Sequence, residues 1–343
     1  MENVLERMVK DEKSEELARL NAVTIVNNLF SELLERERDV LSRRFGLKGG
    51  KGETLEKIGQ MHNLTRERVR QIEVASVRKI KKLETLENCL SSLKTTVTKL
   101  LEEHGGLLRR DYLLDILTVY SLEIGNKDEA EVTEEARSIY RNHFNFLISK
   151  LLEDDLDSVK DSTKFNPAYK LKNTETGHLE ELADSLMSKV EKTTKTLSTE
   201  ELLNLIKSLD VYSKHKEKLK ESGADITPVF KSQTFPDKAE TINADKVLYS
   251  LLQSVKNVEQ NKFGQWGLAD SHEIKPKTIN DKIYLVLKNE NRPMHFTEIA
   301  SRINEVKFDR KNANPATVHN ELILDTRYVL TGRGMYGLKD WQK

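Results

Sequence analysis

The stretch TRERVRQIE, residues 65–73, gathers side chains that bind nucleic acid into nine consecutive positions. Arginine can pair with guanine through two hydrogen bonds, glutamine can pair with adenine in the same way, and glutamate can accept a hydrogen bond from cytosine. If the stretch is helical, Glu67 and Gln71 stand one turn apart beside the basic side chains. The charged and hydrogen-bonding residues of this stretch are Arg66, Glu67, Arg68, Arg70 and Gln71.

The surrounding residues predict the helices that must position these side chains. Thr65 is a good helix N-cap, because its hydroxyl can accept from an unpaired backbone N–H of the first turn. Thr54 predicts a similar cap for a short helix over residues 55–61, and residues 62–64 have the length of a helix-turn-helix connection. In that motif the second helix enters the major groove of DNA with its N-terminal residues facing the bases. Apolar or small residues at helical spacing can face inward: Leu55, Ile58, Val69, Ile72, Ser76 and Ile80.

Residues 33–82 resemble the fourth conserved region of housekeeping-type bacterial sigma factors. The motifs ERERDVL, RRFGL, a glycine loop, TLEKIG and TRERVRQIE occur in that order. The resemblance implies two partners, double-stranded promoter DNA at the −35 element and the flap of RNA polymerase core. It implies base contacts by Arg66, Glu67 and Gln71, and phosphate or polymerase contacts by Arg68 and Arg70. Thr65 and Arg78 complete the DNA-binding set expected here, and the alternative is a protein-binding helix-turn-helix whose arginines are only solvated.

The net charge of zero conceals a strong asymmetry. Residues 43–82 contain twelve lysines and arginines but four acidic residues, whereas residues 86–190 contain thirteen basic and twenty acidic residues. A short basic block inside a neutral chain is typical of a polyanion-binding site. Cys89 is the one cysteine, which excludes an internal disulfide framework and a thiolate metal site. The sequence shows no apolar signal core and no run as long as a membrane helix, so we expect a cytoplasmic protein with no membrane partner.

The whole chain predicts a mainly α, multi-domain fold in which a helix-turn-helix domain is followed by three winged-helix-like modules with short β-hairpin wings. Each module contains an amphipathic helix, a segment leading to a second helix, a third helix and a strand pair, as in three diverged copies of one unit. GQWGLAD and GMYGLKD are the clearest correspondence between copies. The expected boundaries are a helical lead-in at 1–30, the helix-turn-helix domain at 31–85, and modules at 88–175, 178–271 and 277–343.

The last module resembles the HARE-type helix-turn-helix domain, a winged-helix family that includes the N-terminal domain of the RNA polymerase delta subunit. The resemblance lies in PMHFTEIASRIN, in the helix over residues 315–324 and in the closing GRGMYGLKDW. Gly332 and Gly334 are expected to take the positive φ of a hairpin turn. Thr297 and, in the middle module, Thr199 are expected to begin the second helix.

For several residues of the modules the sequence is compatible both with contact to nucleic acid and with a purely structural role. Trp266 and Tyr336 can stack on nucleic acid, but packing against their own helices is the favoured interpretation. Arg333, at the tip of the last wing, is a candidate phosphate contact or a solvated charge. Lys307, Arg310 and Lys311 can line the same face, and such contacts would add affinity without sequence information.

Catalytic and metal-binding patterns are missing from the sequence. The eight histidines do not cluster at ligand spacing, and there is no serine elbow, paired-carboxylate arrangement or dinucleotide-binding turn. The glycines at 46–52 do not match a P-loop, because three residues rather than four separate Gly46 from Gly50 and Gly52 follows Lys51. The acidic run at 153–157 is interpreted as a solvated loop and not as a metal site. We therefore expect a protein that is not an enzyme and has no cofactor or metal.

Three functional hypotheses remain. The first is a sequence-specific DNA-binding transcription factor of the sigma-like class, although no aromatic-rich region that could hold melted promoter DNA precedes Leu33. The second is an RNA polymerase accessory or interaction scaffold, in which the acidic 86–190 segment docks on the basic helix at 66–82 and holds the protein closed. The third is a DNA-binding component of a restriction-type system.

Overall fold

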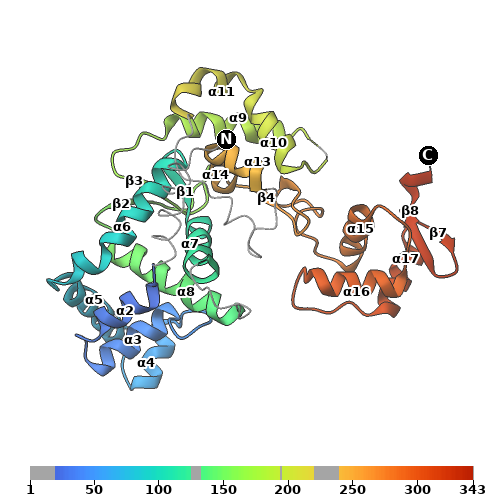
Figure 1. Cartoon of the computed structure of the whole chain (residues 1–343). Coiled ribbons are helices and arrows are strands. Elements are labelled where there is room, and N and C mark those ends of the chain that lie inside the picture. Colours follow the sequence, from blue (N-terminus) through green and yellow to red (C-terminus); the bar gives the residue numbers. More distant parts are fainter. Residues whose placement is uncertain (1–19, 125–132, 194, 220–238, 343) are drawn as a thin grey trace. The chain divides into compact units, whose positions relative to one another are not determined.

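The structure is a computed structural model that describes residues 20–124, 133–193, 195–219 and 239–342 (Figure 1). In these residues helices predominate and the strands form small antiparallel sheets, which confirms the mainly α prediction. The chain divides into two compact units, residues 1–181 with 214–256 and residues 182–213 with 257–343.

The helix-turn-helix domain contains four described helices. They are α2 (Ala22–Phe30), α3 (Glu35–Phe45), α4 (Leu55–His62) and α5 (Arg66–Lys81). The predicted lead-in helix falls mainly on residues 1–19, which lie outside the described residues. Ser31 ends α2 by donating its N–H to the Asn27 carbonyl, and α3 begins at Glu35.

The next module forms a helical bundle with a three-stranded sheet. Its strands have the order β1-β3-β2 and all pairs are antiparallel. The elements are α6 (Leu86–Glu103), β1 (Leu107–Arg109), α7 (Arg110–Thr118), the π-helix η1 (Val119–Ile124), α8 (Glu134–Phe146), the π-helix η2 (Leu147–Leu151), β2 (Leu156–Val159) and β3 (Ala168–Leu171).

The last module repeats that sequence of elements. Its antiparallel sheet has the order β6-β8-β7, in which the first strand again pairs with the last. The elements are α15 (Ile279–Glu290), β6 (Met294–His295), α16 (Phe296–Val306), α17 (Pro315–Leu324), β7 (Tyr328–Gly332), β8 (Met335–Leu338) and the 3-10 helix η4 (Lys339–Gln342). At the tip of the hairpin Gly334 has a φ of +72° but Gly332 does not have a positive φ, so the expectation for Gly332 is wrong. A register shift between Leu330 and Gly332 helps to turn the chain instead.

The middle module is divided between the two compact units. Its elements are α9 (Gly177–Val190), α10 (Thr199–Lys207), α11 (Asp210–His215), the 3-10 helix η3 (Lys216–Leu219), α13 (Ala239–Ala244), α14 (Lys246–Ser254), β4 (Val258–Gln260) and β5 (Trp266–Leu268). Leu197 makes an isolated antiparallel bridge to Trp266 of β5. Helix α14 packs on β1 of the preceding module, where the Ser250 hydroxyl donates to the Leu107 carbonyl over 2.6 Å. The division into three repeated modules stays a prediction.

Helix α10 begins at Thr199 as expected, whereas α16 begins at Phe296, one residue before the expected Thr297. Ser198, not Thr199, caps α10, and its hydroxyl and the Glu201 carboxylate each accept from the other's backbone N–H. His295 is the cap residue of α16, and its ring nitrogen accepts from Thr297 N–H. The predicted threonines lie inside the first turn, because a polar residue that precedes each of them already satisfies the free backbone donor.

Candidate nucleic-acid interface

A small apolar core sets the angle between α4 and α5. Val40, Ile58 and Val69 are fully buried in it, one from each of α3, α4 and α5. The partly buried residues packed around them are Leu55, Leu64 and Ile72. On α5 Ser76 and Ile80 are also fully buried, which confirms that the residues at this helical spacing face inward.

The turn between α4 and α5 depends on Asn63 and Gly59, two residues that the sequence analysis did not single out. Asn63 has a φ of +54°, a left-handed conformation that asparagine tolerates better than most residues. Leu64 N–H donates to the Gly59 carbonyl over 2.8 Å, and a Cβ atom on Gly59 would lie 2.6 Å from the Leu64 carbonyl oxygen. Only glycine therefore fits at position 59, and the Ile-Gly pair in TLEKIG was the available signal.

Both predicted caps are confirmed. The Thr54 hydroxyl accepts from Lys57 N–H and begins α4, and the Thr65 hydroxyl accepts from Arg68 N–H and begins α5. Because the Thr65 hydroxyl accepts from Arg68 N–H, it fixes the first turn of α5. Thr65 therefore positions this turn.

The leading turns of α5 expose all five predicted contact residues. The Arg70 guanidinium donates to both Glu67 oxygens over 2.9 and 2.7 Å, and Arg68 donates to the Gln71 amide oxygen over 3.1 Å. The hydrogen bond from Arg70 holds the pKa of Glu67 below its ordinary value. These are surface pairs between residues three apart, so exchanging them for contacts with DNA costs little. Arg66, Glu67, Arg68, Arg70 and Gln71 are all exposed.

An open groove follows the exposed side of α5 beyond its first turns. It contains four cationic side chains and the small apolar residues between them, so it can accept a phosphate backbone. Arg78 lies in this groove, as the predicted DNA-binding set requires. The lining residues are Arg70, Gln71, Val74, Ala75, Arg78, Lys79 and Lys82.

A partly buried polar network connects two helices of the domain. Asp39 accepts from Arg43 over 2.7 Å and lies 2.9 Å from the His62 ring nitrogen. Partial burial works to raise the pKa of Asp39, but the hydrogen bonds from Arg43 and His62 outweigh it and lower that pKa. The network ties α3 to the end of α4, directly before the turn that leads to α5.

Helix α8 and η2 of the next module pack against the helix-turn-helix domain. The Phe146 ring is fully buried between Phe30 and Phe45, with ring centroids 5.6 and 4.9 Å apart. The Asn142 amide donates to the carbonyls of Gly46 and Gly50, each over 2.8 Å. The glycine loop thus holds a neighbouring module and not a phosphate group.

The acidic run at 153–157 makes ion pairs with the far end of α5. Lys81 lies 2.6 Å from Glu153 and 3.2 Å from Asp154, and Lys94 of α6 lies 2.6 Å from Asp155. Glu153 and Asp154 are exposed in a turn, in agreement with the solvated-loop interpretation, but they also pair with Lys81, and the end of the run, Leu156 and Asp157, belongs to strand β2. The contact falls at the C-terminal end of α5 and leaves the leading turns exposed.

The structural interpretation of the two aromatic wing residues is confirmed. Trp266 is 2% exposed and Tyr336 is 5% exposed. The Trp266 indole N–H donates to the Thr199 hydroxyl over 2.9 Å. Neither ring is therefore available to stack on nucleic acid. Arg333, at the tip of the last wing, is exposed. In the sequence it lies far from the helix-turn-helix domain.

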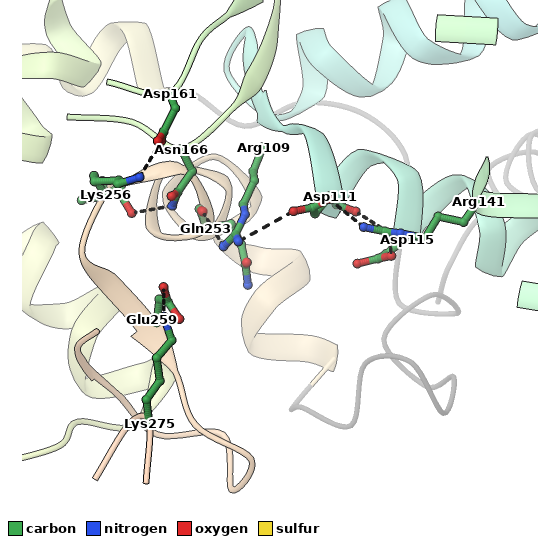
Figure 2. Close-up of polar contacts among 11 residues, drawn as sticks. Arg109, Asp111, Asp115, Arg141, Asp161, Asn166, Gln253, Lys256, Glu259 and Lys275 are labelled. Atoms are coloured by element: carbon green, nitrogen blue, oxygen red, sulfur yellow. Dashed lines mark hydrogen bonds and ion pairs between the residues drawn. The ribbon is translucent and has the colours of Figure 1, made fainter. Parts of the chain in front are cut away.

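A second polar cluster lies inside the module at 88–175 and joins α7 to α8 (Figure 2). Arg141 of α8 pairs with Asp111 and Asp115 of α7, and Arg109 lies near Asp111. Burial raises the pKa of Asp115 to about 6, although the Arg141 charge works in the opposite direction. The cluster is a partly exposed ion-pair network that joins two helices.

Two features are absent from the described part of the chain. No group of three or more histidine, cysteine, aspartate or glutamate side chains there is arranged to hold a metal ion. No described helix is both long and apolar enough to span a membrane.

Comparison with known proteins finds a family match to the helix-turn-helix domain. The sigma-70 region 4 family matches residues 29–82. The RNA polymerase sigma factor SigA of Microcystis aeruginosa is 47% identical over 72 residues, which are 21% of this chain and 16% of the relative. SigA1 of Synechococcus elongatus is 52% identical over 56 residues, 16% of this chain and 14% of the relative.

The matched region is thus about one sixth of the length of these curated relatives. No solved structure matches the chain. Family, relatives and the geometry of α4 and α5 agree on one segment: residues 29–82 are a sigma region 4 helix-turn-helix, a DNA-binding domain without enzymatic activity.

Proposed function

We propose that this chain is a sequence-specific DNA-binding transcription factor of the sigma-like class. The leading turns of α5 read promoter DNA at a −35-like element, and the same domain engages RNA polymerase core. In this account Arg66, Glu67 and Gln71 contact base edges. Arg68, Arg70 and Arg78 contact phosphates or polymerase, and Thr65 holds the first turn in place.

The observation that carries the proposal is the exposure of one capped helix start. Five side chains with the hydrogen-bonding chemistry of base and phosphate recognition are exposed there, and a basic groove continues along the same helix. The module packed behind the domain contacts α5 at Glu73 and Lys81 and does not cover that start. This arrangement supports DNA binding without a preceding release step.

The other modules have a supporting role in the proposal. The order helix, strand, two helices and two strands, with the first strand paired to the last, supports winged-helix folds for residues 88–175 and 277–343. The last of these is proposed to be HARE-type, and Arg333 is its candidate phosphate contact. A single small module gives few base contacts, and tethered modules can compensate through effective concentration.

The test is a footprint of the full chain on promoter DNA, made with and without RNA polymerase core at several salt concentrations. We expect protection of a short upstream element, and an affinity whose logarithm falls steeply with the logarithm of salt concentration. A footprint that appears only with polymerase and persists after Arg66→Ala would favour the accessory-subunit alternative. No protection under either condition would contradict the proposal.

A further inference from the structure

Helix α8 uses separate faces for its own module and for the helix-turn-helix domain. Arg141 pairs with two carboxylates of α7 in the same module. The residues that meet the helix-turn-helix domain recur at helical spacing and form a stripe on another face of α8. They are Glu135, Ser138, Ile139, Asn142 and Phe146. One helix therefore joins the module to the domain without sharing side chains between the two contacts.

The contact with the helix-turn-helix domain is built like a protein-recognition site. Phe146 is a single aromatic anchor, fully buried between the rings of Phe30 and Phe45. At the edge of the contact, the Lys150 ammonium lies 5.7 Å from the centroid of the Phe45 ring and 3.8 Å from a Glu73 oxygen. A buried aromatic anchor with polar contacts around it is typical of binding between separate proteins. A helix that lays one face into a groove is a recurring way to make such contacts.

The covered surface and its cover belong to different parts of the chain. Phe30, Phe45 and the glycine loop lie within residues 29–82, which match the sigma region 4 family, whereas α8 and η2 lie outside that range. Without α8 and η2, the two rings and the carbonyls of Gly46 and Gly50 would lose their cover. Exposed apolar patches of this kind mark protein contacts. The family domain thus contains a surface suited to a protein partner, and this chain fills it with its own helix.

This surface is separate from the part of the domain that can bind DNA. The five predicted contact residues at the start of α5 are exposed, whereas Glu73, further along the helix, pairs with Lys150 of η2. DNA can therefore bind while α8 stays in place. A protein that needs the rings of Phe30 and Phe45 cannot bind until α8 and η2 have moved away.

We propose, on the basis of the function proposed above, that α8 and η2 occupy the surface through which the helix-turn-helix domain engages RNA polymerase core. The chain then binds DNA in the closed form and binds polymerase only when α8 and η2 are released. The polymerase element that replaces them is a helix with an aromatic or large aliphatic side chain, because the surface holds a ring between two others. The apparent affinity for polymerase is reduced by the fraction of molecules that are closed.

Binding of the full chain to RNA polymerase core, measured by biolayer interferometry without DNA, tests the proposal. Phe146→Ala weakens the closed contact, so its dissociation constant for core should be at least about tenfold lower than that of the wild type. Asn142→Ala removes the donor to two loop carbonyls and perturbs the module less, and it should lower the dissociation constant by about fivefold.

The matched control is Phe144→Ala. Phe144 is also a fully buried phenylalanine of α8, but it lies two residues before Phe146 and therefore on the opposite side of the helix. The control loses as large a side chain and leaves the contact with the helix-turn-helix domain in place. Once circular dichroism shows that it is folded, it should bind core as the wild type does.

Hydrogen exchange of the wild type in complex with core provides a second readout. Amides of η2 and of the second half of α8 should exchange faster in the complex than in the free chain, because release removes their packing. Unchanged protection of these amides would overturn the proposal, and so would equal dissociation constants for the wild type, Phe146→Ala and Asn142→Ala. Both results would leave DNA recognition intact. Failure of every variant to bind core would overturn the proposal together with the polymerase part of the proposed function, while a footprint on DNA alone would still support the DNA part.

Discussion

The two ends of α5 have opposite surroundings. At its start Arg66, Glu67, Arg68, Arg70 and Gln71 are exposed, and side-chain pairs there join Arg68 to Gln71 and Arg70 to Glu67 on the surface. Toward its end Glu73 and Lys81 pair with Lys150, Glu153 and Asp154 of the neighbouring module. The start of α5 is thus available to bind DNA, and the rest of the helix contacts the neighbouring module. A substitution in one of these parts should leave the contacts of the other part unchanged.

The pairs at the start of α5 also differ in strength from the contacts that hold the neighbouring module. The pairs at the start are exposed and weak, so DNA can replace them at little cost. The neighbouring module is attached elsewhere on the domain, to α2, α3 and the glycine loop, through the fully buried Phe146 ring and through backbone carbonyls that accept from Asn142, and these contacts cannot be exchanged without leaving a cavity or unpaired groups. Substitutions at the start of α5 and at the module contacts should therefore have different consequences.

Phe146→Ala should lower the free energy of unfolding by about 3–5 kcal/mol, because it leaves a cavity between Phe30 and Phe45. Denaturant unfolding measured by circular dichroism checks this. Below the unfolding transition the variant should keep the base preference of the wild type. A change in base preference with an unchanged free energy of unfolding would show that DNA recognition and the module contact are not independent.

Arg66→Ala should weaken binding to the footprinted site by about 1–3 kcal/mol and relax the preference at one base pair. Fluorescence anisotropy with labelled duplexes measures the affinity, and denaturant unfolding provides the stability control. The free energy of unfolding should be unchanged, because Arg66 is exposed. Equal weakening on every duplex would assign Arg66 to phosphate and not to a base.

Asn142→Ala should destabilise the protein by about 1–2 kcal/mol, because the carbonyls of Gly46 and Gly50 lose a shared donor. Hydrogen exchange should show faster opening of the loop at 46–52 and little change in α5. An unaltered exchange rate in that loop would mean that the amide does not hold it.

Lys81→Ala should change the free energy of unfolding by less than about 1 kcal/mol. Its partners Glu153 and Asp154 are 56% and 83% exposed, and exposed ion pairs contribute little. The matched variant Lys79→Ala breaks the pair with Glu37 and should have a similarly small effect. A loss of several kcal/mol from Lys81→Ala would show that the acidic run is a principal attachment.

The sequence predicted the helix-turn-helix domain closely because its signals are local. Thr54 and Thr65 cap the helices they precede, and the inward spacing of Val69, Ser76 and Ile80 follows from the helical period. The exposure of the contact residues follows from the same period.

Contacts between distant segments could not be predicted in the same way. Phe146 lies in an ordinary apolar run, and nothing nearby in the sequence indicates that it packs on Phe30 and Phe45. The placement of α14 against β1 joins residues about 140 positions apart. The ion pair between Lys81 and Glu153 could not be predicted, because it depends on the fold of the intervening module. The sequence showed only that the two segments have opposite net charges.

The account rests on contacts between the start of α5 and base edges. The decisive measurement is the affinity of the wild type and of Gln71→Ala for duplexes that differ by one base pair. Each base pair of the footprinted site would be replaced in turn and the two proteins titrated against every duplex at one salt concentration. The account predicts that the variant loses discrimination at a single position containing adenine and keeps it elsewhere. Identical discrimination profiles for the two proteins would contradict the account.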